Sequence, residues 1–394
     1  MTFVHLFAIG YISFILNFEK VFGVEQAVLI SKSVLLLSAI IATATRTRIT
    51  ISSWLAWLAV LLVLVTATFT RFYGFAWSNW FRALNNVVVP FFLLSIVPNE
   101  KDRDSLLQIL AWGPVVSIVA GIFYQVTGRA TLFGSDNISG AQRLQGSLIP
   151  AFLAGVALTG ALSAFFLAQC RNSRFLWLAV VDLLILLMTA ARMPLALAVV
   201  ICGYFFLFEL NITRTMKVAV LAFSTVVVAC FLATVGHIII DRFGSGNMSG
   251  RDILWRYLYT VIDRYWDFGV GLGHVKFVVP RAVSVFVGGV VAPHNEFIRL
   301  SVELGVIGAS LYIVIYVLIM LNLCSKVHAG RPVVLLGGLG FLTFCYTDNA
   351  FLTPTYYPML FAVAFWALCL PPLNRYSQNM TYFVGENRQM GPGK

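Results

Sequence analysis

The chain has 394 residues, of which 60% are hydrophobic and only 11% are charged, and its mean hydropathy is +0.88. Soluble globular proteins carry about 25% charged residues, so this composition excludes a soluble fold and indicates a membrane protein with many spans. The formal net charge of +11 does not indicate nucleic acid as a partner, because Lys and Arg gather in cytoplasmic loops and near anionic lipid headgroups.

Apolar runs long enough to cross a bilayer recur along the chain. A helix needs about 20 mainly apolar residues to cross the hydrocarbon core. We therefore predict an all-α, polytopic membrane protein with about twelve transmembrane helices, at residues 2–18, 26–45, 50–70, 83–98, 105–127, 147–169, 174–191, 193–210, 215–239, 296–323, 331–350 and 353–371. Spans one to nine then occupy residues 1–239, a long loop 240–295, spans ten to twelve 296–371, and a polar tail 372–394.

The distribution of Lys and Arg between the loops predicts the orientation. Thirteen of these residues lie in loops and tail on one side of the predicted spans, and six lie in short loops on the other side. The positive-inside rule then makes both termini cytoplasmic and places the loop 240–295 on the periplasmic face of a bacterial inner membrane. From Asp252 this loop has apolar residues at helical spacing, so we expect an amphipathic helix over 252–265 that lies on the membrane surface.

The segment "GVGLG" at 269–273 is similar in composition to a nucleotide-binding loop. No βαβ pattern surrounds it, and its glycines follow G-x-G-x-G instead of G-x-G-x-x-G. We interpret it as a turn or a close approach between two backbones.

The stretch "PHNEFIRLSVELG" at 293–305 opens the tenth predicted span. Asn295 or His294 suits the N-cap of that helix. Glu296, Arg299 and Glu303 are spaced three and four apart, which predicts an ion-pair ladder at the membrane interface, with a functional role as the alternative. His294 precedes the span near the positive end of the helix dipole, which favours a neutral imidazole. Such a base can take a proton from a hydroxyl nucleophile, although a lone interfacial histidine also suits a structural role.

Arginines predicted to lie outside form a second group of candidates. Arg192 lies in a very tight turn between two apolar runs, where a charge is costly unless it has a partner, and Arg143 and Arg251 lie on the same side. Guanidinium groups bind phosphate oxygens in bidentate geometry, so the three together would suit a diphosphate leaving group. Each one alone would also suit a side chain that extends to lipid headgroups.

Two acidic residues inside predicted spans suggest a different class of function. Asp182 and Glu209 would suit a proton-driven carrier. Glu209 falls at a cytoplasmic end, however, and we expect Asp182 to pair with Arg171 or Arg174.

These segments resemble the O-antigen ligase and O-antigen polymerase superfamily of bacterial inner-membrane glycosyltransferases. "SGRDILW" is followed by "FGVGLG" and then by "PHNEFIRLSVELGVIG". His294-Asn295, nine residues and then Gly305-x-x-Gly308 look like the H-N-x9-G-x-x-G signature of the ligase members. The turn "AARMPLAL" is similar to the short Ser-Arg or Ala-Arg segment of the family. "RLQGSLIP" resembles a looser stretch, in which Ile149 and Ala151 replace asparagines that often flank the proline.

The resemblance implies a metal-independent, inverting glycosyltransferase that needs no cofactor and acts at the periplasmic face in lipopolysaccharide biosynthesis. Its donor would be a glycan on undecaprenyl diphosphate, and its acceptor a sugar hydroxyl of the lipid A–core. The sequence agrees, since no cluster of outward carboxylates offers a magnesium site. The site residues that follow are His294, Arg192 and Arg251 as catalytic residues, and Arg143, Asn295, Glu296 and Arg256 as substrate-binding residues.

Each of these residues receives a role from the resemblance. Arg192 and Arg251, together with Arg143, would bind the diphosphate and stabilise its charge as it departs. His294 would accept the proton of the attacking hydroxyl, and Asn295 or Glu296 would orient the imidazole. The helix at 252–265 would help to seat the two lipids in the membrane.

Two other functions remain as alternatives. An O-antigen polymerase would use the same donor with a second lipid-linked glycan as acceptor, but the single long loop and the H-N-x9-G-x-x-G spacing favour the ligase. A transporter of lipid-linked glycans would need polar residues along a route through the spans, whereas the polar residues gather on one face.

Overall fold

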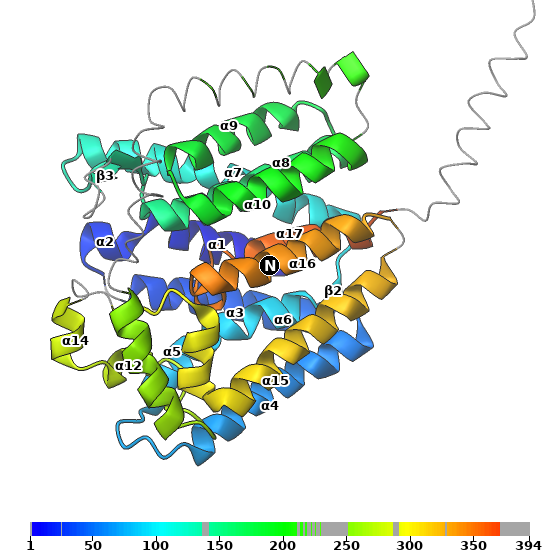
Figure 1. Cartoon of the computed structure of the whole chain (residues 1–394). Coiled ribbons are helices and arrows are strands. Elements are labelled where there is room, and N and C mark those ends of the chain that lie inside the picture. The colour runs from blue at the N-terminus through cyan, green and yellow to red at the C-terminus, as the bar shows by residue number, and fades with distance from the viewer. Residues whose placement is uncertain are drawn as a thin grey trace, which may run out of the picture.

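The computed structural model describes residues 2–24, 26–135, 142–210, 251–286, 291–327 and 329–370, with a few single positions between 213 and 229. Most of the predicted ninth span, the first part of the long loop and the polar tail therefore lie outside the described residues. The described part is predominantly helical, as predicted, and most of its helices run roughly alongside one another (Figure 1).

The elements follow in chain order. The helices are α1 (Phe3–Leu16), α2 (Phe18–Phe22), α3 (Ala27–Thr45), α4 (Thr50–Phe69), α5 (Trp77–Val87), α6 (Val89–Leu93), α7 (Glu100–Val126), α8 (Pro150–Cys170), α9 (Phe175–Met188), α10 (Arg192–Tyr204) with its π-helical extension η1 (Phe205–Glu209), α12 (Arg251–Arg264), α13 (Val275–Val278), α14 (Arg281–Phe286), α15 (Glu296–Lys326), α16 (Arg331–Thr347), the 3₁₀ turn η2 (Ala350–Leu352) and α17 (Pro358–Leu368). Two short antiparallel ribbons pair β1 (Thr47–Arg48) with β2 (Ile96–Val97), and β3 (Phe133–Ser135) with β4 (Gln142–Leu144).

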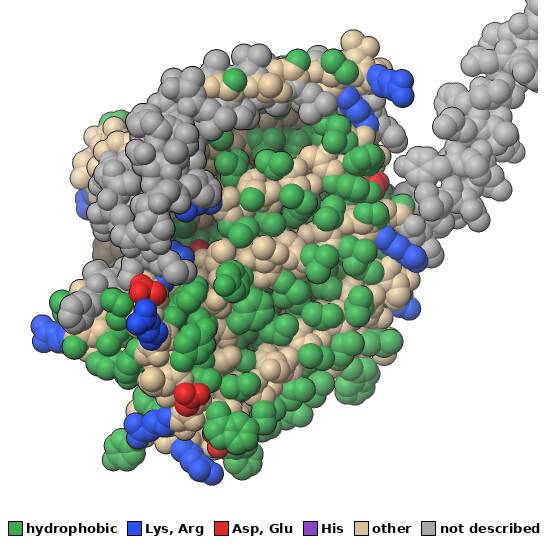
Figure 2. Space-filling model, viewed as in Figure 1, with side chains coloured by type: hydrophobic (Ala, Val, Ile, Leu, Met, Phe, Trp, Pro, Cys, Tyr) green, Lys and Arg blue, Asp and Glu red, His purple; other side chains and the backbone are tan. Residues whose placement is uncertain are grey.

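Six of the described helices are long and apolar enough to cross a membrane, namely α3, α4, α7, α8, α10 with η1, and α15. They coincide with six of the predicted spans. Four shorter apolar helices, α1, α9, α16 and α17, lie within four others. The chain is a multi-pass membrane protein, and an apolar face agrees with this: exposed hydrophobic side chains cover the middle of the molecule in Figure 2, whereas Lys and Arg lie toward its two ends.

The predicted fourth span, 83–98, is not one helix, and this prediction is wrong. The segment divides into α5 and α6, which meet at Val88. Pro90 explains the break, because it has no N–H to donate to the carbonyl of Asn86 one turn earlier. Trp80 and Val87 of α5 are buried, whereas Phe81 is exposed.

Two helices that are apolar on every side form the centre of the bundle. All of α8 from Leu153 to Leu167 is buried, and so is α17 from Pro358 to Ala367. A helix without a polar face has to be covered by other helices, and small residues allow the close approach. Gly155 of α8 is one such position, because a side chain there would overlap the ring of Tyr356.

The helix predicted over 252–265 exists as α12, but its apolar face does not lie on the membrane surface. Leu254, Leu258 and Val261 are buried against the first turns of α15, where Ile298 and Val302 cover them. Protein therefore replaces lipid as the partner of this face. Figure 1 shows α12 and α14 at one end of the long helices, with β2 at the other end.

Candidate active site

The start of α15 is built so that His294 stands just ahead of the helix. Asn295 is the N-cap, with an extended backbone and a side-chain Oδ1 that accepts a hydrogen bond from the Ile298 N–H at 3.1 Å. This cap satisfies a backbone donor that the helix leaves unpaired. His294 has a φ of +48°, in the left-handed region that few residues other than glycine adopt. Such local strain, of about 1–3 kcal/mol, concentrates at functional sites.

A carboxylate from another helix orients the His294 ring. The Nδ1 atom of His294 lies 3.2 Å from Oδ1 of Asp348, the residue that follows the last turn of α16. The same Oδ1 accepts the backbone N–H of Asn349 at 2.8 Å, and Oδ2 accepts the hydroxyl of Tyr356 at 2.9 Å. Because an ionised carboxylate only accepts, Nδ1 is the donor in this contact, and the neutral form of the imidazole then has its lone pair on Nε2.

The surroundings of Asp348 keep it ionised. Burial by itself raises the pKa of this carboxyl, but the hydrogen bond and charge of His294, with the donors of Asn349 and Tyr356, outweigh burial and hold the pKa below its usual value. The His294 side chain is 30% exposed and that of Asp348 is 16% exposed. The imidazole is thus open to a reactant while its partner carboxylate lies behind it.

Helix α12 is attached to the same loop. The indole Nε1 of Trp255 donates to the carbonyl of Pro293 at 2.7 Å, one residue before His294. Arg251 lies one helical turn before Trp255 and so shares its face, toward the His294 loop. Arg256 differs: its side chain is 83% exposed and faces Asp252 at 3.9 Å. Of the two α12 arginines predicted for the site, Arg251 is therefore the better placed.

The strand β4 carries Arg143, a third arginine that was predicted for the site. Arg143 of β4 donates through Nε to the carbonyl of Thr189, in the tight turn that ends at Arg192. The Arg143 guanidinium also lies within electrostatic range of the Tyr356 hydroxyl, which binds Asp348. Arg192 is exposed at the first position of α10. A hydrogen bond thus connects Arg143 to the turn that carries Arg192, and its charge acts on Tyr356, the hydrogen-bond partner of Asp348.

The predicted ion-pair ladder forms, but it lies in the interior instead of at an exposed interface. Glu296, Arg299 and Glu303 are all fully buried. Arg299 donates to Glu296 through Nε at 2.9 Å and through Nη2 at 2.5 Å, and it donates to Glu303 through Nη1. Because Arg299 occupies both oxygens of Glu296, this carboxylate does not orient His294, and Asp348 does so instead. A buried ion pair needs such complete pairing to offset its desolvation.

The "GVGLG" segment is a close backbone approach, as predicted. It runs along the first part of α15, where the N–H groups of Val270 and Gly271 donate to the carbonyls of Val302 and Glu303, each at 2.9 Å. Gly305 bends α15 at this point with φ +72° and ψ +167°, and a side chain there would overlap the Asp267 carbonyl. This contact covers Glu303 of the ion-pair ladder and ties the segment after α12 to α15, since the Val306 N–H donates to the Trp266 carbonyl.

The comparisons with known proteins concern this region. Residues 175–313 match the family model described as O-antigen ligase. The matched segment covers less than half of the chain and supports a relationship to the O-antigen ligase superfamily. The match includes six of the candidate residues, from Arg192 on α10 to Glu296 on α15, whereas Arg143 and Asp348 lie outside it. No curated protein matches the chain.

The O-antigen ligase family implies a glycosyltransferase-like enzyme.

The structure adds two residues to the candidate site that the sequence patterns did not single out. Asp348 and Tyr356 were missed, although the polar triplet "TDN" at 347–349 interrupts an otherwise apolar region. The expected pairing of Asp182 with Arg171 or Arg174 is wrong: both carboxylate oxygens of Asp182 are buried without a hydrogen-bond partner among the described residues, and Arg171 donates to Asp104 at 2.8 Å. Within the described ranges, no group of three His, Cys, Asp or Glu side chains is arranged to hold a metal ion.

Proposed function

We propose that this protein is an O-antigen ligase that transfers a glycan from undecaprenyl diphosphate to a sugar hydroxyl of the lipid A–core. The observation that carries the proposal is the His294–Asp348 pair at 3.2 Å, in which His294 stands at the start of α15 within the segment that matches the family model. A histidine oriented by a carboxylate, with its second nitrogen open, is the arrangement that general-base catalysis requires.

The chemistry uses that open nitrogen. Nε2 of His294 accepts the proton of the acceptor hydroxyl as its oxygen attacks the anomeric carbon of the donor glycan. The new carbon–oxygen bond forms while the bond from the anomeric carbon to the diphosphate breaks on the opposite side, which inverts the configuration. Asp348 stabilises the imidazolium that forms, because it is ionised and hydrogen-bonded to Nδ1.

The arginines supply charge for the leaving group. Arg192 and Arg251 bind oxygens of the undecaprenyl diphosphate, and Arg143 supports the turn that carries Arg192. Guanidinium groups suit this task because they present paired donors and stay protonated. Positive charge fixed in place before the reaction lowers the barrier, since it requires no reorganisation as negative charge develops.

Asn295 and Glu296 take positioning roles in this proposal. Asn295 caps α15 and is nearly fully buried, and Glu296 is held by Arg299, so neither side chain is free to reach a substrate. Arg256 is exposed on the other side of α12 and is available to headgroups of substrate or membrane lipids.

The Lys and Arg distribution supports a periplasmic site in the bacterial inner membrane with cytoplasmic termini. The His294 end of the helices is then periplasmic, where lipid-linked glycans and lipid A–core would both reach the site without nucleotide sugars.

A reconstitution with two possible acceptors tests this function. Purified protein in liposomes receives undecaprenyl-diphosphate glycan, with or without lipid A–core, and the products are separated by size. The proposal expects a glycan ladder on lipid A–core that His294→Ala abolishes. Growth of the glycan on undecaprenyl diphosphate would instead indicate a polymerase. Movement of the lipid across the bilayer without a new bond would indicate a transporter.

A further inference from the structure

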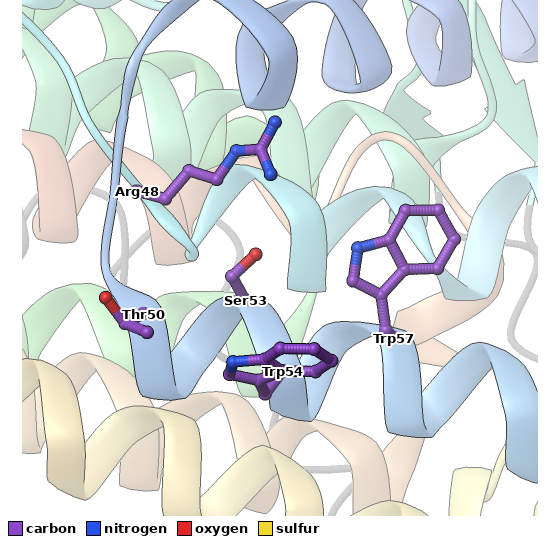
Figure 3. A pocket seen from close by; sticks show the side chains of 5 residues that line it. All are labelled: Arg48, Thr50, Ser53, Trp54 and Trp57. Atoms are coloured by element: carbon purple, nitrogen blue, oxygen red, sulfur yellow. The ribbon is translucent and has the colours of Figure 1, made fainter.

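We propose that a pocket at the N-terminal end of α4 binds the phosphate headgroup of an anionic phospholipid. A cavity of about 230 Å³ is lined there by Arg48, Thr50, Ser53, Trp54 and Trp57. In Figure 3 the Arg48 side chain reaches over Ser53 toward Trp57, and the Trp54 indole lies beyond Ser53 on the other side. The pocket thus combines one cation, two hydroxyls and two indoles.

Arg48 is held in place without being neutralised. Its Nε donates to the carbonyl of Thr43 at 2.7 Å, which leaves the two terminal nitrogens for a ligand. Its neighbour Arg46 differs, because it pairs with Asp102. Within the part of the chain that the structure describes, no carboxylate pairs with Arg48. A guanidinium with two open nitrogens is suited to bidentate binding of phosphate oxygens.

The start of α4 offers further donors to the same pocket. The residue before the helix is Ile49, whose side chain cannot cap it, so the first backbone N–H groups of α4 have no side-chain partner. The hydroxyls of Thr50 and Ser53 line the pocket beside them, and neither bonds to another described residue. Free N–H groups and a positive dipole at a helix start favour an anion, and here they add to the charge of Arg48.

The two indoles decide between a phospholipid and a free phosphate. Trp54 is 73% exposed and Trp57 is 53% exposed, although both lie in the first turns of an apolar helix long enough to span the membrane. Tryptophan at such a position lies at the level of the lipid headgroups, with its ring against acyl chains and glycerol. A free phosphate has no apolar part to cover these rings, whereas a phospholipid has one.

The pocket is separate from the proposed active site. The opposite end of α4 is bound to the "GVGLG" segment, because the Thr70 hydroxyl donates to the Gly269 carbonyl. The 20 residues of α4 span about 30 Å, which places the pocket on the other membrane face from His294. By the Lys and Arg distribution this is the cytoplasmic face, whose leaflet carries anionic lipids.

Native mass spectrometry of the full-length protein in detergent tests the pocket. Phosphatidylglycerol is titrated against phosphatidylcholine of the same acyl chains, and bound lipid is counted for wild type, Arg48→Gln and Trp54→Ala. We expect wild type to retain one phosphatidylglycerol in preference to phosphatidylcholine, and Arg48→Gln to bind it about fivefold more weakly. Trp54→Ala removes an exposed indole from the pocket without disturbing the core, so it tests whether that ring contributes to lipid binding.

Arg174→Gln is the matched control, since it removes the same charge from an exposed position at the start of α9, at the same end of the molecule. It should bind phosphatidylglycerol like wild type. Equal losses in Arg48→Gln and Arg174→Gln would overturn the proposal in favour of general surface charge. Equal binding of the two lipids would overturn it as well, and so would displacement of the lipid by an equal concentration of glycerol 3-phosphate.

Discussion

Replacing Asp348 by Asn tests how His294 is activated. The substitution removes the charge but preserves the shape of the side chain, and the amide oxygen can still accept from His294 Nδ1 and from the Asn349 N–H. The amide group can then donate to the Tyr356 hydroxyl, so every polar partner of the carboxylate retains a hydrogen bond. What changes is the stabilisation of the imidazolium that forms during transfer.

The expected effect follows from the geometry of the pair. A hydrogen bond to a charged group contributes about 1.5–3 kcal/mol. The separation here is 3.2 Å and the His294 side chain is 30% exposed, so solvent screening favours the lower part of that range. A loss of about 1.5–2 kcal/mol corresponds to a kcat about ten- to thirtyfold lower. KM should stay near its original value, because Asp348 touches His294 and not the substrates.

The assay is the initial rate of glycan transfer to lipid A–core in liposomes, at saturating concentrations of both lipids. Asp263→Asn is the control, since it removes an exposed carboxylate from α12 at the same end of the molecule. The control should retain the wild-type rate. If Asp348→Asn also transfers at the wild-type rate while remaining folded, Asp348 has no part in activating His294.

Other predictions concern the remaining parts of the site. Arg192→Lys should reduce kcat at least about tenfold, because a lysine cannot bind the diphosphate in bidentate geometry; a rate equal to wild type would remove Arg192 from the leaving-group site. Gly305→Ala should destabilise the protein by at least about 2 kcal/mol, measured as a lower thermal unfolding midpoint, because of its positive φ and the overlap with Asp267. Gly203→Ala, in α10 with open space around it, should be neutral or stabilising, and a similar loss in both variants would contradict this account of Gly305. The pKa of Asp348 is lower in the folded protein than in the unfolded chain. The ionised carboxylate therefore stabilises the fold above about pH 4, and this stabilisation is lost as the pH falls through the pKa that Asp348 has in the folded protein. Unfolding midpoints measured from pH 3 to 7 should depend less on pH in Asp348→Asn than in wild type.

The spans were predictable because bilayer thickness fixes the length of an apolar helix. Runs such as 50–70 and 105–127 contain α4 and most of α7. The break between α5 and α6 was not read from the sequence, although Pro90 marks it, because the surrounding residues are apolar enough to extend the run. The short helix α17 has the apolar sequence of a membrane span for a different reason. Its side chains are buried by other helices of the protein, so they are apolar without facing lipid.

The candidate site was predictable in part. The helix-start pattern correctly placed His294 just ahead of α15, and residue spacing correctly paired Arg299 with Glu296 and Glu303. The catalytic role of His294 stays a prediction. Burial of those three residues depends on tertiary packing, such as the docking of the "GVGLG" segment against Glu303, which spacing along one helix does not reveal. Asp348 lies 54 positions from His294 and at the end of another helix, so only the packing of α16 beside α15 brings the two together.

The central claim is that His294 is the general base of a glycan transfer to lipid A–core. The most direct measurement is the transfer rate of His294→Ala and His294→Gln in liposomes that contain undecaprenyl-diphosphate glycan and lipid A–core. Loss of the base should reduce the rate by about 10²–10⁴-fold in both variants, while the protein still inserts and keeps its unfolding midpoint. Transfer by either variant at the wild-type rate would contradict the account.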